Sequence, residues 1–74
     1  MRLYINEQVS AQVKNTSPAQ LWFFVCDSRS PLASVVEAYI SVETAKRRAR
    51  LIGGVVRAGR VEQERASKWT AVTL

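Results

Sequence analysis

Residues 41–60 read S-V-E-T-A-K-R-R-A-R-L-I-G-G-V-V-R-A-G-R, and the net charge of the chain is concentrated in this window. The window holds six basic residues and one acid, Glu43, so its charge of +5 equals that of the whole chain. The five basic and five acidic residues outside the window cancel. Such a concentration indicates a partner that is acidic or that exposes phosphates.

The first part of the window predicts one amphipathic helix. Ser41 is a residue of the N-cap type, and Glu43 would place a negative charge where it complements the helix dipole. Gly53-Gly54 predicts the end of the helix, because glycine readily takes the left-handed conformation that closes one. An apolar stripe at i, i+3, i+7 and i+10 would face the core, and its members are Val42, Ala45, Ala49 and Ile52.

The basic side chains of this helix are predicted to face outward. Lys46, Arg47 and Arg50 lie away from the apolar stripe, and Arg48 flanks it on the other side. The following strand adds two more cations, which would extend a composite basic surface. The candidate partner-binding or phosphate-binding residues are therefore Lys46, Arg47, Arg50, Arg48, Arg57 and Arg60.

The segments around the helix predict strands. In residues 3–13 and 34–40, apolar side chains recur with a period of two. Residues 20–26 form an apolar, aromatic run that is too short for a helix. Residues 55–64 and 68–74 predict a final pair of strands, and Gly59 predicts a bulge in the first of them. We therefore expect a single α+β domain of order βββαββ, spanning residues 1–74. Its antiparallel sheet has about five strands, the first three form a meander, and one helix packs on one face.

The apolar strand has a hydrophobic side chain on both faces. Leu21, Phe23 and Val25 alternate with Trp22, Phe24 and Cys26. A single helix covers one face of a sheet, so a homodimer partner or the binding target would have to cover the other. The candidates for a hydrophobic interface are therefore Trp22, Phe24 and, opposite the apolar stripe of the helix, Leu51. We interpret Cys26 as a core residue.

Composition excludes several classes of protein. A chain of 74 residues with 47% hydrophobic and 23% charged residues is typical of one small folded domain. With one cysteine and no histidine, it has neither an intramolecular disulfide nor a zinc site of the usual ligands. Without a run of membrane-spanning length, we expect a cytoplasmic protein that has no membrane partner and needs no cofactor or metal.

The sequence does not predict an enzyme. The absence of histidine removes the commonest general base and any Ser-His or Cys-His pair. Glu62 and Glu64 are the nearest pair of carboxylates, and we interpret them as a solvated strand face that balances Arg60 and Arg65. Gly53-Gly54 has no phosphate-loop context.

Three segments resemble one family of small phage-encoded anti-CRISPR proteins that act on type I-F surveillance complexes. They are residues 41–49 with the glycines that follow, residues 60–62 (R-V-E) and residues 68–69 (K-W). The resemblance implies a stoichiometric inhibitor that docks on a crRNA-guided complex in the bacterial cytoplasm and blocks hybridisation of target DNA. It assigns the docking positions to Lys46 and Arg47, with Arg50 as a looser addition.

Two alternatives stay open. Residues 41–48 also resemble the start of the recognition helix in winged-helix phage excisionases, which implies a DNA- or RNA-binding protein whose Arg47, Arg48 and Arg50 contact phosphates and base edges. The other alternative is a small oligomer that sequesters an anionic nucleotide signal between its protomers.

Overall fold

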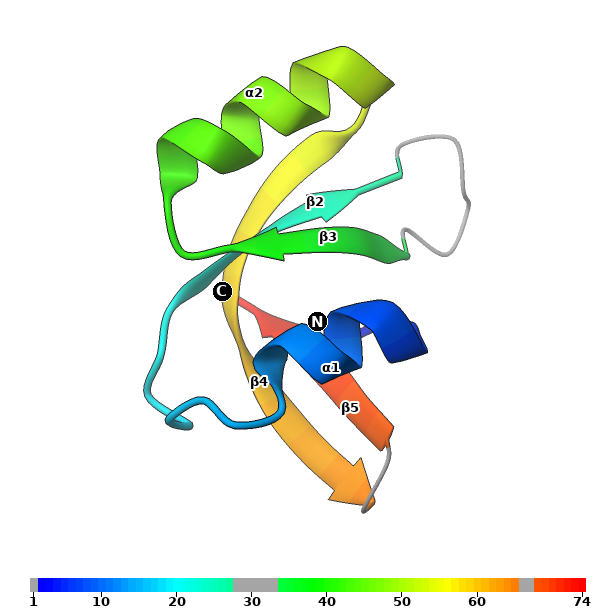
Figure 1. Ribbon diagram of the computed structural model, residues 1–74, viewed down its shortest axis with the longest axis vertical. Coiled ribbons are helices and arrows are strands. Elements are labelled where there is room, and N and C mark those ends of the chain that lie inside the picture. Colours follow the sequence, from blue (N-terminus) through cyan, green and yellow to red (C-terminus); the bar gives the residue numbers. More distant parts are fainter. Residues whose placement is uncertain (1, 28–33, 66–67) are drawn as a thin grey trace.

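The computed structural model describes residues 2–27, 34–65 and 68–74, which form two helices and one sheet (Figure 1). The strands form a five-stranded antiparallel sheet in the order β1-β5-β4-β2-β3. The predicted α+β class and five-stranded antiparallel sheet are confirmed. In chain order, the elements are β1 (Arg2–Tyr4), α1 (Glu7–Val13), β2 (Trp22–Cys26), β3 (Val35–Tyr39), α2 (Val42–Ile52), β4 (Val55–Arg65) and β5 (Lys68–Thr73).

The prediction of a single helix is wrong, because α1 forms where residues 3–13 predict a strand. The Asn6 side chain caps this helix by accepting a hydrogen bond of 2.9 Å from the backbone N–H of Val9. Val9 and Val13 are both buried. Residues four apart share a face in a helix and in a strand alike, so this spacing did not distinguish the two structures. The cap at Asn6 is a local signal that favours the helix over the strand.

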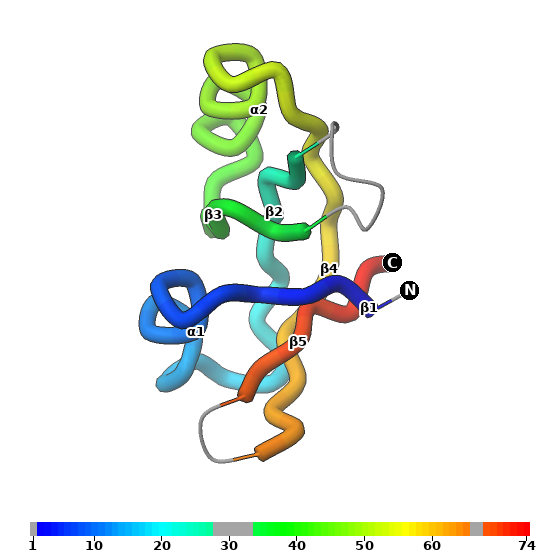
Figure 2. Tube along the Cα trace, turned by 90° about the vertical axis from the view of Figure 1, so that its right-hand side faces the viewer, coloured from blue at the N-terminus to red at the C-terminus, as the bar shows by residue number. Residues whose placement is uncertain are grey.

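The predicted order βββαββ and the N-terminal meander are corrected in the same region. β1 pairs with β5, where Leu3 lies opposite Ala71, and the order along the chain is βαββαββ. Directly after β1, Ile5 forms a parallel bridge with Val35 of β3. Because β1 and β3 are the two edges of the sheet, this bridge curls the sheet toward a closed barrel (Figure 2).

The β2–β3 hairpin lies between the two helices, with α2 above it and α1 below it in Figure 1. Phe24, which is 0% exposed, and Trp22 pack in a core that includes Val9 and Val13 of α1. Val25 packs on the other side with the two buried alanines of α2. The second face of β2 is therefore covered by α1 of the same chain, rather than by a dimer partner or a target. Trp22 and Phe24 are core residues and not an interface.

The predicted bounds of α2 are confirmed. The Ser41 hydroxyl accepts a hydrogen bond of 3.4 Å from the backbone N–H of Thr44. Gly53 has a φ of 70° in the left-handed region, and the N–H of Gly54 donates to the carbonyl of Ala49 at 2.9 Å. The small side chain of Ala49 is buried against the sheet, which allows a close approach of the helix.

β4 changes partner at Gly59. This residue pairs with Trp22 of β2 on one side and with Thr73 of β5 on the other. The predicted bulge at Gly59 is wrong, because the register is regular there and shifts only between Gln63 and Arg65. Glycine is required for a different reason, namely that a Cβ atom would lie 2.3 Å from the carbonyl oxygen of Val72.

We expect Gly59→Ala to destabilise the fold by about 2–3 kcal/mol, because the added methyl group would overlap backbone atoms that cannot move away as a side chain can. Urea denaturation followed by tryptophan fluorescence measures this change. Gly53→Ala is the matched control: it meets no atom within 4 Å and should cost only about 1 kcal/mol for its positive φ. Equal losses in both variants would contradict the close approach at Gly59.

Candidate functional site

The side of α2 that faces away from the sheet carries three cations and one large apolar residue. The buried pair Ala45 and Ala49 marks the inner side of the helix. At about 100° per residue, Arg47 points opposite to these alanines, with Arg50 and Lys46 on one flank and Leu51 on the other. All four are exposed, Leu51 to 71%. We call Lys46, Arg47, Arg50 and Leu51 the α2 outer face.

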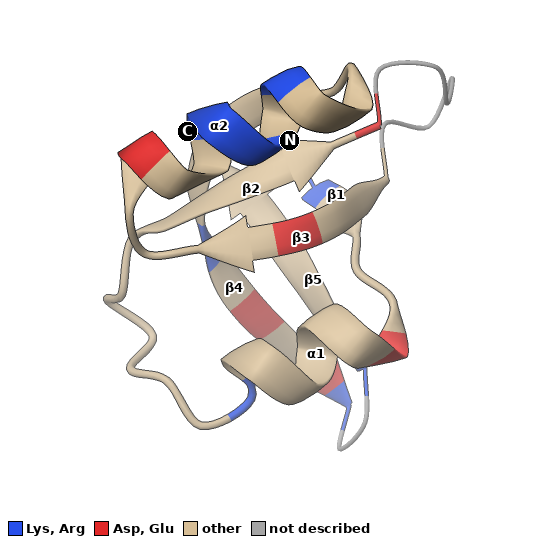
Figure 3. Ribbon diagram, turned by 45° about the horizontal axis from the view of Figure 1, so that its top comes forward, with Lys and Arg blue, Asp and Glu red and all other residues tan. Residues whose placement is uncertain are grey.

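The charges of the α2 outer face are not neutralised by ion pairs with the described residues. Lys46, Arg47 and Arg50 take part in no salt bridge within residues 2–27, 34–65 and 68–74. Glu43 lies one turn earlier on the same side, but it also forms no ion pair within those ranges. The three cations are therefore available to an anionic partner. Figure 3 shows the basic positions of α2 above the acidic position of β3.

Arg48 has a different role from its neighbours, because its charge is neutralised within the fold. Its Nε and Nη2 atoms donate to the two carboxylate oxygens of Glu37 on β3, at 3.1 Å and 3.0 Å. The hydrogen bond from Arg48 lowers the pKa of Glu37, while partial burial of the carboxylate opposes this shift. The same contact raises the pKa of the Arg48 guanidinium. Arg48 thus joins α2 to the sheet, and it is only half exposed beside the outer face.

The register of the β2–β3 pair puts Glu37 on the side of α2, because Glu37 lies opposite Val25, which packs against α2. The pairing shifts between Val25 and Cys26, so that Val35 packs in the core on the α1 side. Val36 packs on the α2 side, and Glu37 extends on that same side to reach Arg48. The sequence offers no local signal for this bulge.

Arg57 and Arg60 do not extend the α2 outer face as one surface. They are three residues apart in a regular part of β4, so their side chains project from opposite faces of the sheet. Arg57 pairs with Phe24 and shares its face, which is the side of α1. Arg60 shares the side of α2, but its Nε donates to the carbonyl of Ala19 at 3.3 Å, in the segment before β2.

Cys26 is buried in the core, and Glu62 and Glu64 both form ion pairs. The Cys26 thiol is fully buried, as predicted for a core residue, and burial raises its pKa while the positive charge of Arg57 opposes the rise. Glu62 and Glu64 are ion-paired, but not with the predicted Arg60 and Arg65. The actual contacts are Arg2 with Glu62 at 3.0 Å, Arg2 with Glu64 at 3.9 Å, and Lys68 with Glu64 at 3.5 Å.

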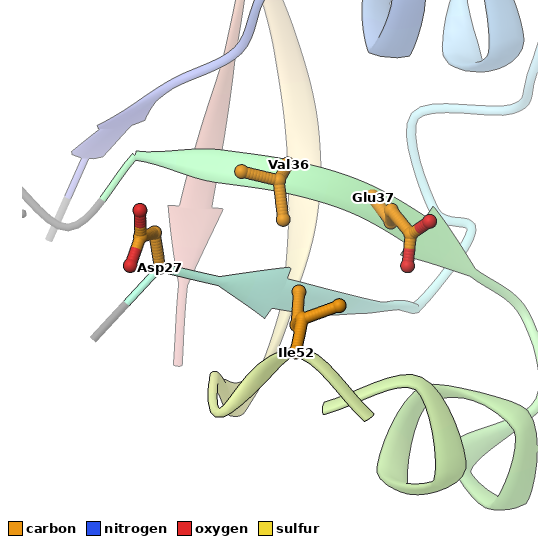
Figure 4. A pocket seen from close by; sticks show the side chains of 4 residues that line it. All are labelled: Asp27, Val36, Glu37 and Ile52. Atoms are coloured by element: carbon orange, nitrogen blue, oxygen red, sulfur yellow. The ribbon is translucent and has the colours of Figure 1, made fainter. Parts of the chain in front are cut away.

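A pocket of about 270 Å³ lies between the β2–β3 hairpin and the C-terminal end of α2 (Figure 4). Val36 and Ile52 provide its apolar surface, and the carboxylates of Asp27 and Glu37 stand on either side of them. Such a lining suits an apolar or amphipathic side chain of a partner. The residues come from separate elements, so sequence reasoning missed the pocket. No group of three metal-ligating side chains occurs among the residues that the structure describes.

Comparison with known proteins identifies no relative. Family models, curated proteins and solved structures were all searched, and none of them matches this chain. In the described parts of the chain, neither helix combines the length and the apolar character that a membrane span requires.

We expect Glu37→Gln to lower the free energy of unfolding by about 0.5–1 kcal/mol at pH 7, because it removes the charged partner of Arg48 from a bidentate but half-exposed pair. The pKa of Glu37 is lowered in the folded state, so its contribution is complete above the ordinary carboxyl pKa. It is lost as the pH falls through the folded value. Urea unfolding should therefore show the difference between the two proteins shrinking below about pH 4.

A double-mutant cycle supplies the control for this prediction. In a protein that already carries Arg48→Met, the further change Glu37→Gln should leave the free energy of unfolding at pH 7 almost unchanged. Additive losses from the two substitutions would show that Glu37 stabilises the fold without Arg48.

Proposed function

We propose that this protein acts without catalysis, as a binding protein that docks the α2 outer face on an acidic surface of a protein or nucleoprotein complex. One contrast carries the proposal. Arg48 is neutralised by a bidentate contact with Glu37, whereas Lys46, Arg47 and Arg50 on the same helix form no ion pair with the described residues. A partner that supplies carboxylates or phosphates would neutralise these three charges.

Leu51 favours a protein surface as the direct contact. It is 71% exposed and follows Arg47 by four residues, so the two side chains are neighbours on the helix. An apolar side chain beside arginines is typical of protein interfaces, in which Arg is enriched and the buried centre is apolar. A phosphate backbone gains nothing from a leucine, because its contacts are electrostatic.

The resemblance of residues 41–49 to anti-CRISPR proteins suggests the first target to test. On a crRNA-guided surveillance complex, the α2 outer face would occupy a surface that receives the phosphates of the target strand or lies next to it. Binding there would exclude the target nucleic acid because both cannot occupy the same site. The cations would also accelerate association at low ionic strength.

The variant Lys46→Gln/Arg47→Gln/Arg50→Gln should lose partner binding by at least about 100-fold and keep its fold, because all three side chains are exposed. Pull-down from bacterial lysate, followed by biolayer interferometry with purified surveillance complex, measures the loss. A second variant, Leu51→Ser, should weaken binding to the complex while the charge is unchanged.

The matched control is Lys14→Gln/Arg57→Gln/Arg65→Gln, which removes the same charge from exposed positions outside the α2 outer face. This control should bind almost like the wild type. Equal losses in both triple variants would mean that only net charge matters and would reject docking through α2.

Direct binding of nucleic acid by α2 is tested in a gel shift with duplex DNA at about 50 mM and about 200 mM salt. The proposal expects weak binding at both concentrations. Tight, salt-sensitive binding that depends on Lys46, Arg47 and Arg50 would instead establish the DNA- or RNA-binding alternative.

A further inference from the structure

Part of the sheet has a face that neither helix covers. α2 packs on β2, β3 and the first half of β4, whereas α1 lies on the side of the sheet that contains the main core (Figure 2). The strand register places two rows of side chains on the uncovered face of β1, β5 and β4. One row is Arg2, Val72 and Arg60, and the other is Tyr4, Thr70 and Glu62, of which Thr70 is buried. We call these six residues the open sheet face.

Tyr4 presents an aromatic ring to solvent on this face. Its neighbours Leu3 and Ile5 point into the core and are only 3% and 4% exposed, while Tyr4 is 61% exposed. The ring of Tyr4 therefore contributes little to the packing of the core. Exposed aromatic rings on strands serve as stacking surfaces for the bases of single-stranded nucleic acids.

A guanidinium group is held in place on the same face. Arg2 donates from Nη1 to the Thr70 hydroxyl at 3.2 Å and from Nη2 to Glu62 at 3.0 Å, and Glu64 lies 3.9 Å from Nη1. These contacts fix the guanidinium of Arg2 before any ligand binds, so stacking a base on its plane would cost little further conformational entropy. Bases stack on arginine planes as well as on aromatic rings.

The charges around this face complement a phosphate backbone. β1, β5 and residues 60–65 carry four cations and two carboxylates. Both carboxylates, Glu62 and Glu64, are already paired with Arg2 or Lys68. Arg60 and Arg65 remain as cations that form no ion pair with the described residues.

We propose that the open sheet face binds a short single-stranded nucleic acid, with bases stacked on Tyr4 and Arg2 and with phosphates near Arg60 and Arg65. A duplex does not fit this arrangement, because its bases are already stacked and paired. Val72 is the only large apolar side chain of the six besides Tyr4, so the face lacks the apolar centre of a typical protein interface. This site is separate from the α2 outer face and does not depend on the function proposed for it.

Fluorescence polarisation with labelled DNA and RNA strands of about 12 nucleotides tests the proposal. Wild-type protein should bind single strands more tightly than a duplex of the same sequence, and the affinity should fall with salt. Tyr4→Ala should weaken binding by about tenfold or more without changing the charge, whereas Tyr4→Phe should bind like the wild type. Circular dichroism checks that the variants remain folded.

The variant Lys46→Gln/Arg47→Gln/Arg50→Gln is the control for location. It lowers the net charge by three, so it should weaken strand binding, but by less than the charge-neutral Tyr4→Ala does. The proposal is overturned if single strands do not bind, if Tyr4→Ala binds as tightly as the wild type, or if the α2 variant shows the larger loss. None of these outcomes decides whether α2 docks on a protein complex.

Discussion

Burial of both faces of β2 is the constraint on which the rest of the structure depends. Trp22 and Phe24 point to one side of this strand, and Phe23 and Val25 to the other. Each large apolar side chain contributes about 2 kcal/mol when it is buried, so a small domain cannot leave either face in water. Two helices meet this requirement from opposite sides. Because the inner side of α2 is engaged with the sheet, its basic side must face solvent.

The two helices also divide the sheet into covered and uncovered parts. α2 is 11 residues long and spans only β2, β3 and the first half of β4. β4 exchanges β2 for β5 at Gly59, and beyond that point neither helix covers the outer face of the sheet. As a result, the basic residues lie on separate surfaces. Arg48 and Arg2 hold elements together through carboxylates, while Lys46, Arg47 and Arg50 remain exposed without such partners among the described residues.

Sequence patterns predicted those elements whose signals are local. The Ser41 cap and the Gly53-Gly54 end located α2, and its periodicity correctly turned Arg47 and Leu51 outward. The same reasoning missed α1, because the Val9 and Val13 spacing fits a strand as well as a helix, and the cap at Asn6 was the overlooked signal. It also grouped Arg57 with Arg60, although side chains three residues apart on a regular strand face opposite ways.

The amino-acid sequence by itself determined that this is a small α+β domain with one strongly basic amphipathic helix, because caps, periodicity and charge act between residues close together in the chain. Tertiary structure alone decided which strands pair and therefore which side chains share a face. The pairing of β1 with β5 and the bridge between Ile5 and Val35 join residues that are distant in the chain, and the bond from Arg48 to Glu37 joins two different elements. Such contacts form only when the whole chain buries its core, so no local pattern encodes them.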